Sequence, residues 1–136
     1  MTGKSAGDRS PRSSVPKRAP DAERQARWRR GRWSEIAAAV ALGLKGYRIL
    51  ARNFRSPVGE IDIIAARGMR IAFVEVKRRA TLEAAQAAIG ARQRQRIARA
   101  AALWIARNQE FARHEQGFDV VIVMPRRWPR HETNVL

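Results

Sequence analysis

Two short runs of β-branched and apolar residues constrain the fold of this chain most. Glu60 to Ala65 and Ile71 to Lys77 are rich in isoleucine, valine and phenylalanine, a composition typical of strands. The linker between them, Ala66 to Arg70, is short enough for a hairpin, with Gly68 at a position of positive φ. We therefore expect two adjacent strands joined by a tight turn.

A helix and a further strand are predicted before this hairpin. Ser34 is suited to the N-cap of the helix, and Gly46 offers a C-terminal stop. Apolar residues at helical spacing predict the inward face, which comprises Ile36, Ala39, Val40, Gly43 and Leu44. Tyr47 to Phe54 then favours a strand, and Pro57 with Gly59 marks the turn that follows it.

After the hairpin the sequence predicts a second helical region and a last strand. Residues 81–108 are rich in Ala, Gln and Arg, with a break near Gly90. The inward stripe of this region is Ile97, Ala100, Ala101, Trp104 and Ile105. Phe118 to Met124 favours a fully buried strand. The expected fold is α/β, a mixed sheet flanked by helices in the order α-β-β-β-α-β.

Length and composition exclude several classes of protein. A chain of 136 residues is the usual size of one domain. It has no run of about 20 apolar residues and no apolar segment near its start, so we expect a soluble, cytoplasmic protein. The lack of cysteine excludes disulfides, thiolate metal sites and cysteine nucleophiles. His114 and His131, the only histidines, do not have the spacing of a zinc site.

The charge of the chain predicts a polyanionic partner. Lys and Arg number 28 against 12 Asp and Glu, which gives a net charge of +16 and a pI near 11.9. Most of the cations are arginine, whose planar fork suits bidentate phosphate contacts. We favour nucleic acid, DNA before RNA, over an anionic membrane surface. The plainer alternative is that arginine serves here only as a solubilising residue.

The first 33 residues differ in composition from the rest. They hold ten basic and three acidic residues and are rich in Ser, Pro and Arg, without a sustained hydrophobic period. We interpret residues 1–33 as a mostly disordered basic arm, in which Asp21 to Arg30 has the composition of a short helix. Residues 34–136 form the expected folded domain.

Three charged residues in the hairpin strands form a candidate site. Because side chains alternate along a strand, Glu75 and Lys77 point the same way. Asp62 lies between two isoleucines in the other strand, next to Glu75 if the strands pair. Adjacent carboxylates repel unless a proton or cation lies between them, and Mg²⁺ commonly binds such oxygens. The alternative is an ordinary ion pair of Glu75 with Lys77, with Asp62 bonded to a turn.

The resemblance of the chain to a known family rests on several motifs. They are Glu35, RNFR at 52–55, GEIDII at 59–64, FVEVKRR at 73–79 and FDVV at 118–121. In these segments the chain resembles the YraN family of small bacterial proteins, over about residues 31–136. That family is assigned to the PD-(D/E)XK nuclease superfamily, which has a restriction-endonuclease-like core, and resembles archaeal Holliday-junction resolvases.

The resemblance implies roles for individual residues. Asp62 and Glu75 match the metal-binding carboxylates of the superfamily, and Lys77 matches its catalytic lysine. Glu35 matches the acid in the first helix of the resolvase branch, and the carbonyl of Val76 would be a further metal ligand. With Mg²⁺ or Mn²⁺ as cofactor, this implies hydrolysis of DNA phosphodiester bonds, at branched or nicked structures. Since resolvases act as dimers, it also suggests a homodimer.

Other positions match the family without an implied role or depart from it. Asn53 and Glu60 match positions that have no assigned function, and a salt bridge that anchors a loop is as good an explanation for Glu60 as chemistry. Gln93 stands where the family often has lysine, which puts an auxiliary catalytic role there in doubt. For Asp119, in the last strand, we expect a salt bridge or a cap.

Exposed arginines are the expected nucleic-acid contacts. Arg92, Arg96 and Arg99 share one helical face and form either a phosphate-binding stripe or an ordinary solvated face. The full predicted set is Arg52, Arg55, Arg78, Arg79, Arg92, Arg96 and Arg99. The first functional hypothesis is a metal-dependent DNA endonuclease. The second is a non-catalytic DNA- or RNA-binding module with the same fold, and the third is an accessory protein of RNA or the ribosome.

Overall fold

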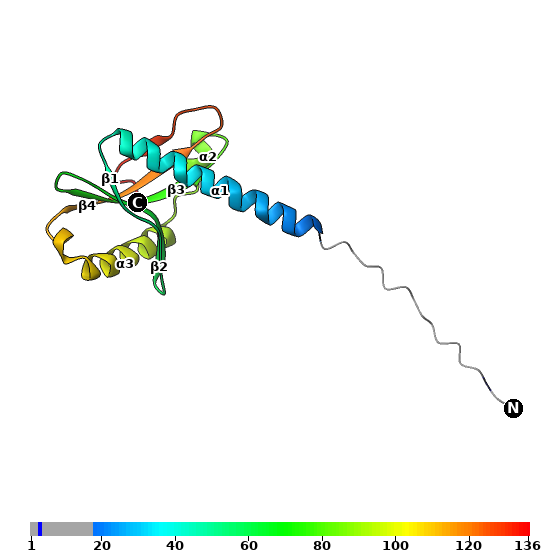
Figure 1. Ribbon diagram of the computed structural model, residues 1–136, viewed down its shortest axis with the longest axis horizontal. Helices are drawn as coiled ribbons and strands as arrows, with labels where there is room; N and C mark the ends of the chain where they lie inside the picture. Colours follow the sequence, from blue (N-terminus) through cyan, green and yellow to red (C-terminus); the bar gives the residue numbers. More distant parts are fainter. Residues whose placement is uncertain (1–2, 4–17) are drawn as a thin grey trace.

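The structure, a computed structural model, describes Gly3 and residues 18–136. Its helices and strands are shown in Figure 1. In chain order they are α1 (Arg18–Leu44), β1 (Arg48–Ser56), β2 (Gly59–Arg67), β3 (Arg70–Arg78), α2 (Leu82–Ala87), α3 (Ala91–Arg107), the 3-10 helix η1 (Gln109–Phe111), β4 (Glu115–Val123) and β5 (Arg130–Glu132).

The strands form one mixed sheet in the order β1-β2-β3-β4-β5. β1, β2 and β3 pair antiparallel, β3 and β4 pair parallel, and β5 pairs antiparallel with β4. The α/β class and the mixed sheet are thus confirmed. The predicted element order α-β-β-β-α-β is wrong in two places. The break predicted near Gly90 is confirmed, but it divides the second helical region into two helices, α2 and α3, with η1 after them, and β5 is an additional strand.

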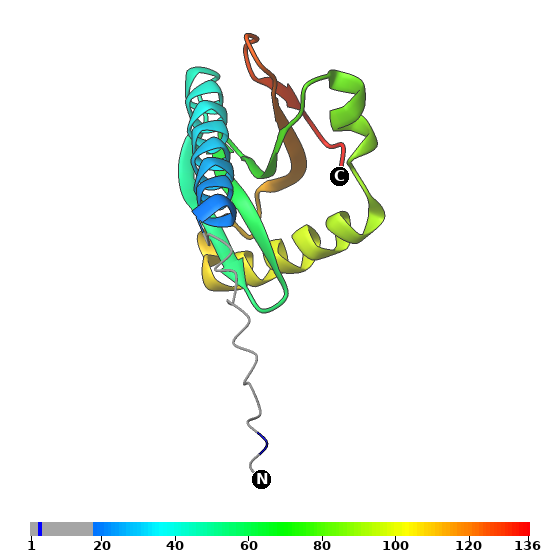
Figure 2. The same ribbon diagram turned by 90° about the vertical axis from the view of Figure 1, so that its right-hand side faces the viewer.

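Helices cover both faces of the sheet (Figure 2). On one face, Leu42 of α1 packs with Val74 and Val121. On the other, Ile97 and Trp104 of α3 pack against Ile61 and Phe73 in a second cluster. In a third cluster, Ala85 of α2 packs with Val120 and Ile122 of β4 and with Met124, which follows β4. The inward stripe predicted for α3 is confirmed, since its residues are buried or pack against this core.

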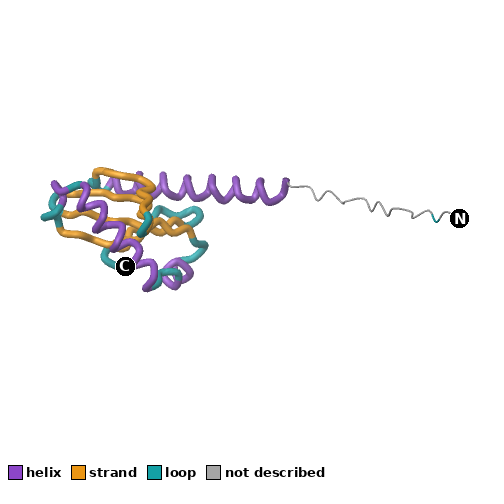
Figure 3. Tube along the Cα trace, turned by 90° about the horizontal axis from the view of Figure 1, so that it is seen from below, coloured by secondary structure: helices purple, strands orange, loops and turns teal. Residues whose placement is uncertain are grey.

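Helix α1 begins at Arg18 and not at Ser34, so the predicted helix start is wrong. The segment contains Ala, Glu, Gln and Arg, which favour helix by themselves, and Pro20 lies in the first turn, where proline is tolerated. This part of α1 extends away from the sheet (Figure 3). The boundary placed between residues 33 and 34 therefore falls inside a helix. Residues 1–2 and 4–17 of the predicted arm lie outside the described residues.

The predicted inward face of the first helix is also wrong. Val40 and Leu44 are exposed by 52% and 72%, whereas Ser34, Glu35, Ala38, Ala41 and Leu42 are buried. Residues 36–44 are apolar all round the helix, so their periodicity does not select a face. The consequence is that Glu35 points toward the sheet.

Two glycines explain the turns on either side of β2. Gly68, in the two-residue turn between β2 and β3, has a φ of 57°, as the sequence predicts. At Gly59, a Cβ atom would lie 2.5 Å from the backbone oxygen of Arg96. The absence of a side chain at Gly59 therefore allows the β1–β2 turn to lie directly against α3.

Candidate functional site

The candidate site begins where the pairing of β2 with β3 ends. The last backbone pair in this direction is Ile63 with Val74, and the next two residues are Asp62 and Glu75. Here the Val76 N–H donates to Oδ2 of Asp62 at 2.8 Å. A carboxylate thus takes the N–H that a paired strand would have bonded. This confirms that Asp62 and Glu75 are neighbours, but Asp62 bonds a strand residue and not a turn.

The orientation of Asp62 results from a change of side along β2. Ile61 packs in the cluster of α3, whereas Ile63 packs in the cluster of α1 on the opposite face. On β1, the residues that pair with them flank Asn53, which has a φ of 53°. Among residues with side chains, asparagine adopts such backbone angles most readily. The positive φ at position 53 therefore gives Asn53 a role in the backbone conformation of β1.

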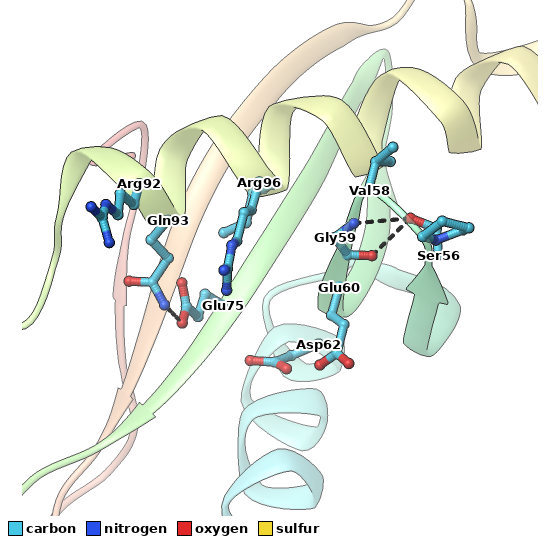
Figure 4. A pocket seen from close by; sticks show the side chains of 11 residues that line it. Ser56, Val58, Gly59, Glu60, Asp62, Glu75, Arg92, Gln93 and Arg96 are labelled. Atoms are coloured by element: carbon cyan, nitrogen blue, oxygen red, sulfur yellow. Dashed lines mark hydrogen bonds between the residues drawn. The ribbon is translucent and has the colours of Figure 1, made fainter.

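Glu75 is held by two side chains at one of its oxygens. Nζ of Lys77 lies 3.4 Å from Oε1 of Glu75, and Nε2 of Gln93 on α3 donates to the same atom (Figure 4). The Lys77 side chain is only 6% exposed. Its contact with Glu75 confirms the prediction that the two side chains lie on the same face of the strand. The other oxygen of Glu75, Oε2, is buried and has no hydrogen-bond partner among the described residues.

Glu35 of α1 is a further acid near Asp62, on the side of the sheet opposite α3. It is 9% exposed, and its Oε1 is buried without a hydrogen-bond partner among the described residues. Burial raises the pKa of Asp62, and the charges of Glu35 and Glu60 add to this effect, while the N–H of Val76 and the charge of Lys77 oppose it. The opposing groups do not offset burial and the neighbouring acids, so the charge of Asp62 is incompletely compensated.

Glu75 titrates in the same direction. Burial raises its pKa and the charge of Asp62 raises it further, although Lys77 lowers it. Proton uptake or the binding of a cation would relieve both groups. The environments of Asp62 and Glu75 thus favour a bound positive charge.

A pocket of about 660 Å³ opens onto these two acids. Acidic residues line it from the strands and other polar residues line it from α3, as Figure 4 shows. They are Glu60, Asp62 and Glu75, with Arg92, Gln93 and Arg96 opposite. The predicted residues Lys77 and Glu35 do not line this pocket. They lie behind it, Lys77 against Glu75 and Glu35 within range of the charge of Asp62.

The arrangement offers two carboxylates to any single ion. Among the side chains that the structure describes, no three acids or histidines are grouped closely enough to hold one metal ion together. The carbonyl of Val76 is a further oxygen on the correct side, because the N–H and C=O of a strand residue point the same way and this N–H faces Asp62. One or two carboxylates with carbonyl, water and phosphate oxygens is a ligand set that Mg²⁺ accepts.

The arginines predicted to contact nucleic acid are all exposed. Arg92 and Arg96 line the pocket, and the charge of Arg79 lowers the pKa of Glu75, which places that guanidinium near the site. The other four are Arg52, Arg55, Arg78 and Arg99. Among the described residues, the loop-anchoring salt bridge considered for Glu60 is not formed.

Gln93 belongs to the site through its contact with Glu75, which the sequence did not predict. Its position four residues before Ile97 places it on the buried stripe of α3, and that spacing is the signal that could have found it. Although the Gln93 amide is neutral, it donates a hydrogen bond to the Glu75 carboxylate.

Asp119, by contrast, is a structural residue, as expected. It is fully buried and forms two 2.8 Å hydrogen bonds with Arg70, a 2.8 Å contact with Nε2 of His131 and a 2.9 Å bond from the N–H of Asn134. Burial opposes its ionisation, but these bonds hold the pKa of Asp119 well below its ordinary range. The predicted salt bridge is confirmed.

Comparison with known proteins places the chain in a family. The model of the uncharacterised protein family UPF0102 matches residues 34–123. A UPF0102 protein of Methylorubrum extorquens is 54% identical over 115 residues, which cover 85% of this chain and 90% of that protein. A second, from Chelativorans sp., is 50% identical over 112 residues, covering 82% and 90% of the two chains. The chain therefore belongs to the UPF0102 family, the YraN-like family that its motifs resemble.

Proposed function

We propose that this protein is a metal-dependent nuclease with a restriction-endonuclease-like core, which binds Mg²⁺ or Mn²⁺ at Asp62 and Glu75 and hydrolyses phosphodiester bonds of DNA. The observation that carries the proposal is Oε2 of Glu75, which is buried close to Asp62 and has no hydrogen-bond partner in the part of the chain that the structure describes. A buried acceptor without a partner costs about 1–3 kcal/mol, and more for a charged group, so a ligand that satisfies it has a clear energetic advantage.

The residues present fit a hard divalent cation. Asp62, Glu75 and the carbonyl of Val76 supply oxygen ligands. Oε1 of Glu35, to which no described residue donates a hydrogen bond, is a further acceptor near Asp62. Such an ion polarises a phosphoryl oxygen and lowers the pKa of bound water. Lys77 and Gln93 both contact Oε1 of Glu75, which fixes the carboxylate and leaves Oε2 for the ligand.

The arginines around the pocket support a polyanionic substrate. Arg92 and Arg96 extend from α3 on the side opposite the acids, so a phosphate group in the pocket would meet cations there (Figure 4). Arginine forms bidentate hydrogen bonds with phosphate oxygens. In this proposal these residues supply affinity, while Asp62, Glu75 and Lys77 serve the reaction. A branched or nicked DNA and a homodimer remain parts of the proposal that rest on the resemblance to resolvases.

Metal binding is tested by thermal unfolding. Mg²⁺ or Mn²⁺ should raise the Tm of the wild type, because a ligand of the native state adds RT ln(1 + [L]/Kd) to its stability. Asp62→Ala and Glu75→Ala should show no such rise, whereas the exposed Glu115→Gln should behave as wild type. An equal rise in the wild type and in both alanine variants would refute the metal assignment.

Catalysis is tested with Lys77→Ala. This change should reduce cleavage by about 10²–10³, by analogy with the removal of one preorganised group that stabilises the transition state. DNA affinity should change little, since one of 28 basic residues is removed. Four-way junction, flap, nicked and plain duplex DNA should be compared for binding and cleavage with Mg²⁺ and Mn²⁺. A wild type that binds these DNAs and cuts none would contradict the enzyme proposal.

The second candidate is a nucleic-acid-binding module without catalysis. It is favoured by the position of Lys77 and Glu35, which lie behind the pocket and not in its lining. Binding that is independent of divalent ions and unaffected by Asp62→Asn would support this module over the nuclease.

A further inference from the structure

The turn between β1 and β2 supplies the exposed apolar part of the pocket that holds Asp62 and Glu75. Residues 56–59 of this turn line that pocket, and both Pro57 and Val58 are exposed. The exposed fraction of Val58 is 44%, whereas Ile97, another apolar residue in the lining, is only 3% exposed. Metal binding and phosphate contacts give no role to this apolar surface.

The conformation of the turn does not require a valine at position 58. Strand turns favour Gly, Pro, Asn, Asp and Ser, each for a conformational or hydrogen-bonding reason. Ser56, Pro57 and Gly59 fit this pattern, but Val58 does not. Single exposed valines are common on protein surfaces. This one differs in its position, because it lies in the lining of a pocket whose other exposed side chains are mostly charged.

The turn is held in one conformation by contacts at both of its ends. Oγ of Ser56 donates to the backbone oxygen of Gly59 at 2.8 Å and accepts from its N–H at 3.2 Å (Figure 4). Pro57 restricts its own backbone angle φ. Gly59 lies directly against the backbone of Arg96 on α3. An apolar surface that is ordered in this way loses little conformational entropy when it meets a ligand.

The position of the turn relates it to a nucleotide next to the bound phosphate. Val58 precedes Asp62 by four residues, which is roughly 13 Å of extended chain. In the proposed function, a phosphate group lies at Asp62 and Glu75 and meets Arg92 and Arg96 across the pocket. Val58 has no polar side-chain atom that could bind this phosphate. Its surface instead suits the face of a base attached to the same strand.

The face of a base is accessible only where the base is not stacked in a duplex. Proteins that contact such faces insert apolar side chains, proline included, or stack the base between apolar and aromatic groups. The exposed surface of Pro57 and Val58 is of this kind, and it shares a pocket with the acids proposed to bind the metal.

We propose that Pro57 and Val58 contact the face of an unpaired base, and that this contact directs the pocket toward DNA with unpaired nucleotides, such as a flap or a bulge. The contact rests on the proposed function, because it takes DNA as the substrate. It also names a narrower substrate class. Nicked duplexes and four-way junctions can be fully base-paired and then offer no unpaired base.

The contact is tested by comparing two DNAs that differ only in unpaired nucleotides, a plain duplex and the same duplex with a bulge. Binding is measured by fluorescence anisotropy in chelator, so that the result does not depend on cleavage. The wild type should bind the bulged DNA about fivefold more tightly, as expected for burial of the exposed part of one valine. In Val58→Ser this ratio should fall to about one, whereas affinity for the plain duplex should be retained.

Val40→Ser is the matched control, since it removes a valine that is 52% exposed on α1, outside the pocket. It should retain the fivefold ratio. A fluorescent base analogue at the bulged position gives a direct readout, because its emission should change on binding to the wild type and to Val40→Ser but not to Val58→Ser. If serine at position 58 alters the Tm, Val58→Thr, which keeps the shape of the side chain, should lower the ratio in the same direction.

Two results would overturn the proposal. One is the same preference for bulged DNA in the wild type and in Val58→Ser, and the other is equal affinity of the wild type for the two DNAs. Both results leave DNA binding and the nuclease proposal standing. A wild type that binds neither DNA would instead remove the proposed function, and the base contact with it, so the two failures are distinguishable.

Discussion

At the scale of single residues, Asp62 and Glu75 destabilise the metal-free protein at neutral pH. Their raised pKa means that the folded chain holds these protons more tightly than the unfolded chain. The resulting stability is fully present below the ordinary pKa values of 3.8 and 4.5 and is lost as pH rises through the folded values. In chelator at pH 7.5, Asp62→Asn and Glu75→Gln should therefore raise the Tm, by about 4 °C for each kcal/mol relieved.

The pH dependence separates this effect from a general gain in stability. Below the ordinary pKa values both acids are protonated in the folded and unfolded chain, so the advantage of the amides should disappear there. Glu115→Gln, at an exposed acid, should leave the Tm nearly unchanged at either pH. If both amide variants had a lower Tm than the wild type at neutral pH in chelator, the claim that these carboxylates destabilise the metal-free protein would be contradicted.

Asp119 is predicted to behave in the opposite way. Its lowered pKa contributes stability that is present above the ordinary value of 3.8 and is lost as pH falls toward the folded value. Asp119→Asn leaves Arg70 without its counterion and should cost about 3–5 kcal/mol in urea unfolding at pH 7. Glu132→Gln breaks the more exposed pair with Arg130 and should cost less than about 1 kcal/mol. Similar losses in both variants would argue against a structural role specific to Asp119.

Much of the candidate site was predictable at this scale, and the exceptions have physical reasons. The alternation of strand residues and the short hairpin were sufficient to bring Asp62, Glu75 and Lys77 together. The contact of Gln93 depends on how α3 crosses the sheet, which local sequence does not encode. The pairing of β2 with β3 ends before Asp62, at the point where Ile61 and Ile63 of β2 face opposite sides of the sheet. This arrangement likewise depends on contacts among β1, β2 and β3 and not on local sequence alone.

At the scale of elements, strands in the core were predicted more accurately than the ends of the chain. β2 and β3 have strong apolar patterns and a turn glycine, so their pairing follows from local sequence. β5 consists of Arg130, His131 and Glu132, without such a pattern, and is held by its pairing with β4 and by the contact of His131 with Asp119. The first half of α1 has helix-forming residues but no apolar stripe, so hydrophobic periodicity does not predict it.

The contact of the β1–β2 turn with α3 leads to a prediction about two glycines. Gly59→Ala would place a Cβ atom 2.5 Å from the backbone oxygen of Arg96, so the turn or the helix must shift, at a cost of about 1–3 kcal/mol. Gly43→Ala, at a helical position with no atom within 4 Å, should instead stabilise by about 0.5–1 kcal/mol. Urea unfolding measures both changes. Equal signs would show that the turn does not pack tightly against α3.

At the scale of the whole molecule, the acids and the cations are distributed differently. Glu35 and Asp119 are buried and Asp62 and Glu75 are partly buried, whereas all seven arginines predicted to contact nucleic acid are exposed. The surface is therefore more positive than a net charge of +16 suggests. Association with nucleic acid should accordingly be governed by phosphate contacts and depend strongly on salt.

The basic arm and the extended part of α1 are predicted to contribute to this salt dependence. Residues 1–33 hold ten basic residues, of which four lie in residues 1–17. Removal of one phosphate contact reduces the slope of log K against log[salt] by about 0.9 on duplex DNA. Deletion of residues 1–17 should flatten the slope, and deletion of residues 1–33 should flatten it further, by several units in total. Fluorescence anisotropy over a range of salt concentrations measures both slopes.

The same deletions test whether the folded domain begins at residue 34. The buried residues described in α1 begin at Ser34, whereas residues 22–25 and 29 and the segment from Gly31 to Trp33 are exposed. Removal of residues 1–33 should therefore leave the core intact and change the Tm far less than Leu42→Ala, a core truncation that typically costs about 2–5 kcal/mol. A loss of cooperative unfolding would show that the domain needs the first half of α1.

The salt slopes have a separate outcome. If they and the Tm are both unchanged by the deletions, residues 1–33 do not contact nucleic acid, and the affinity then resides in the arginines of the sheet and α3.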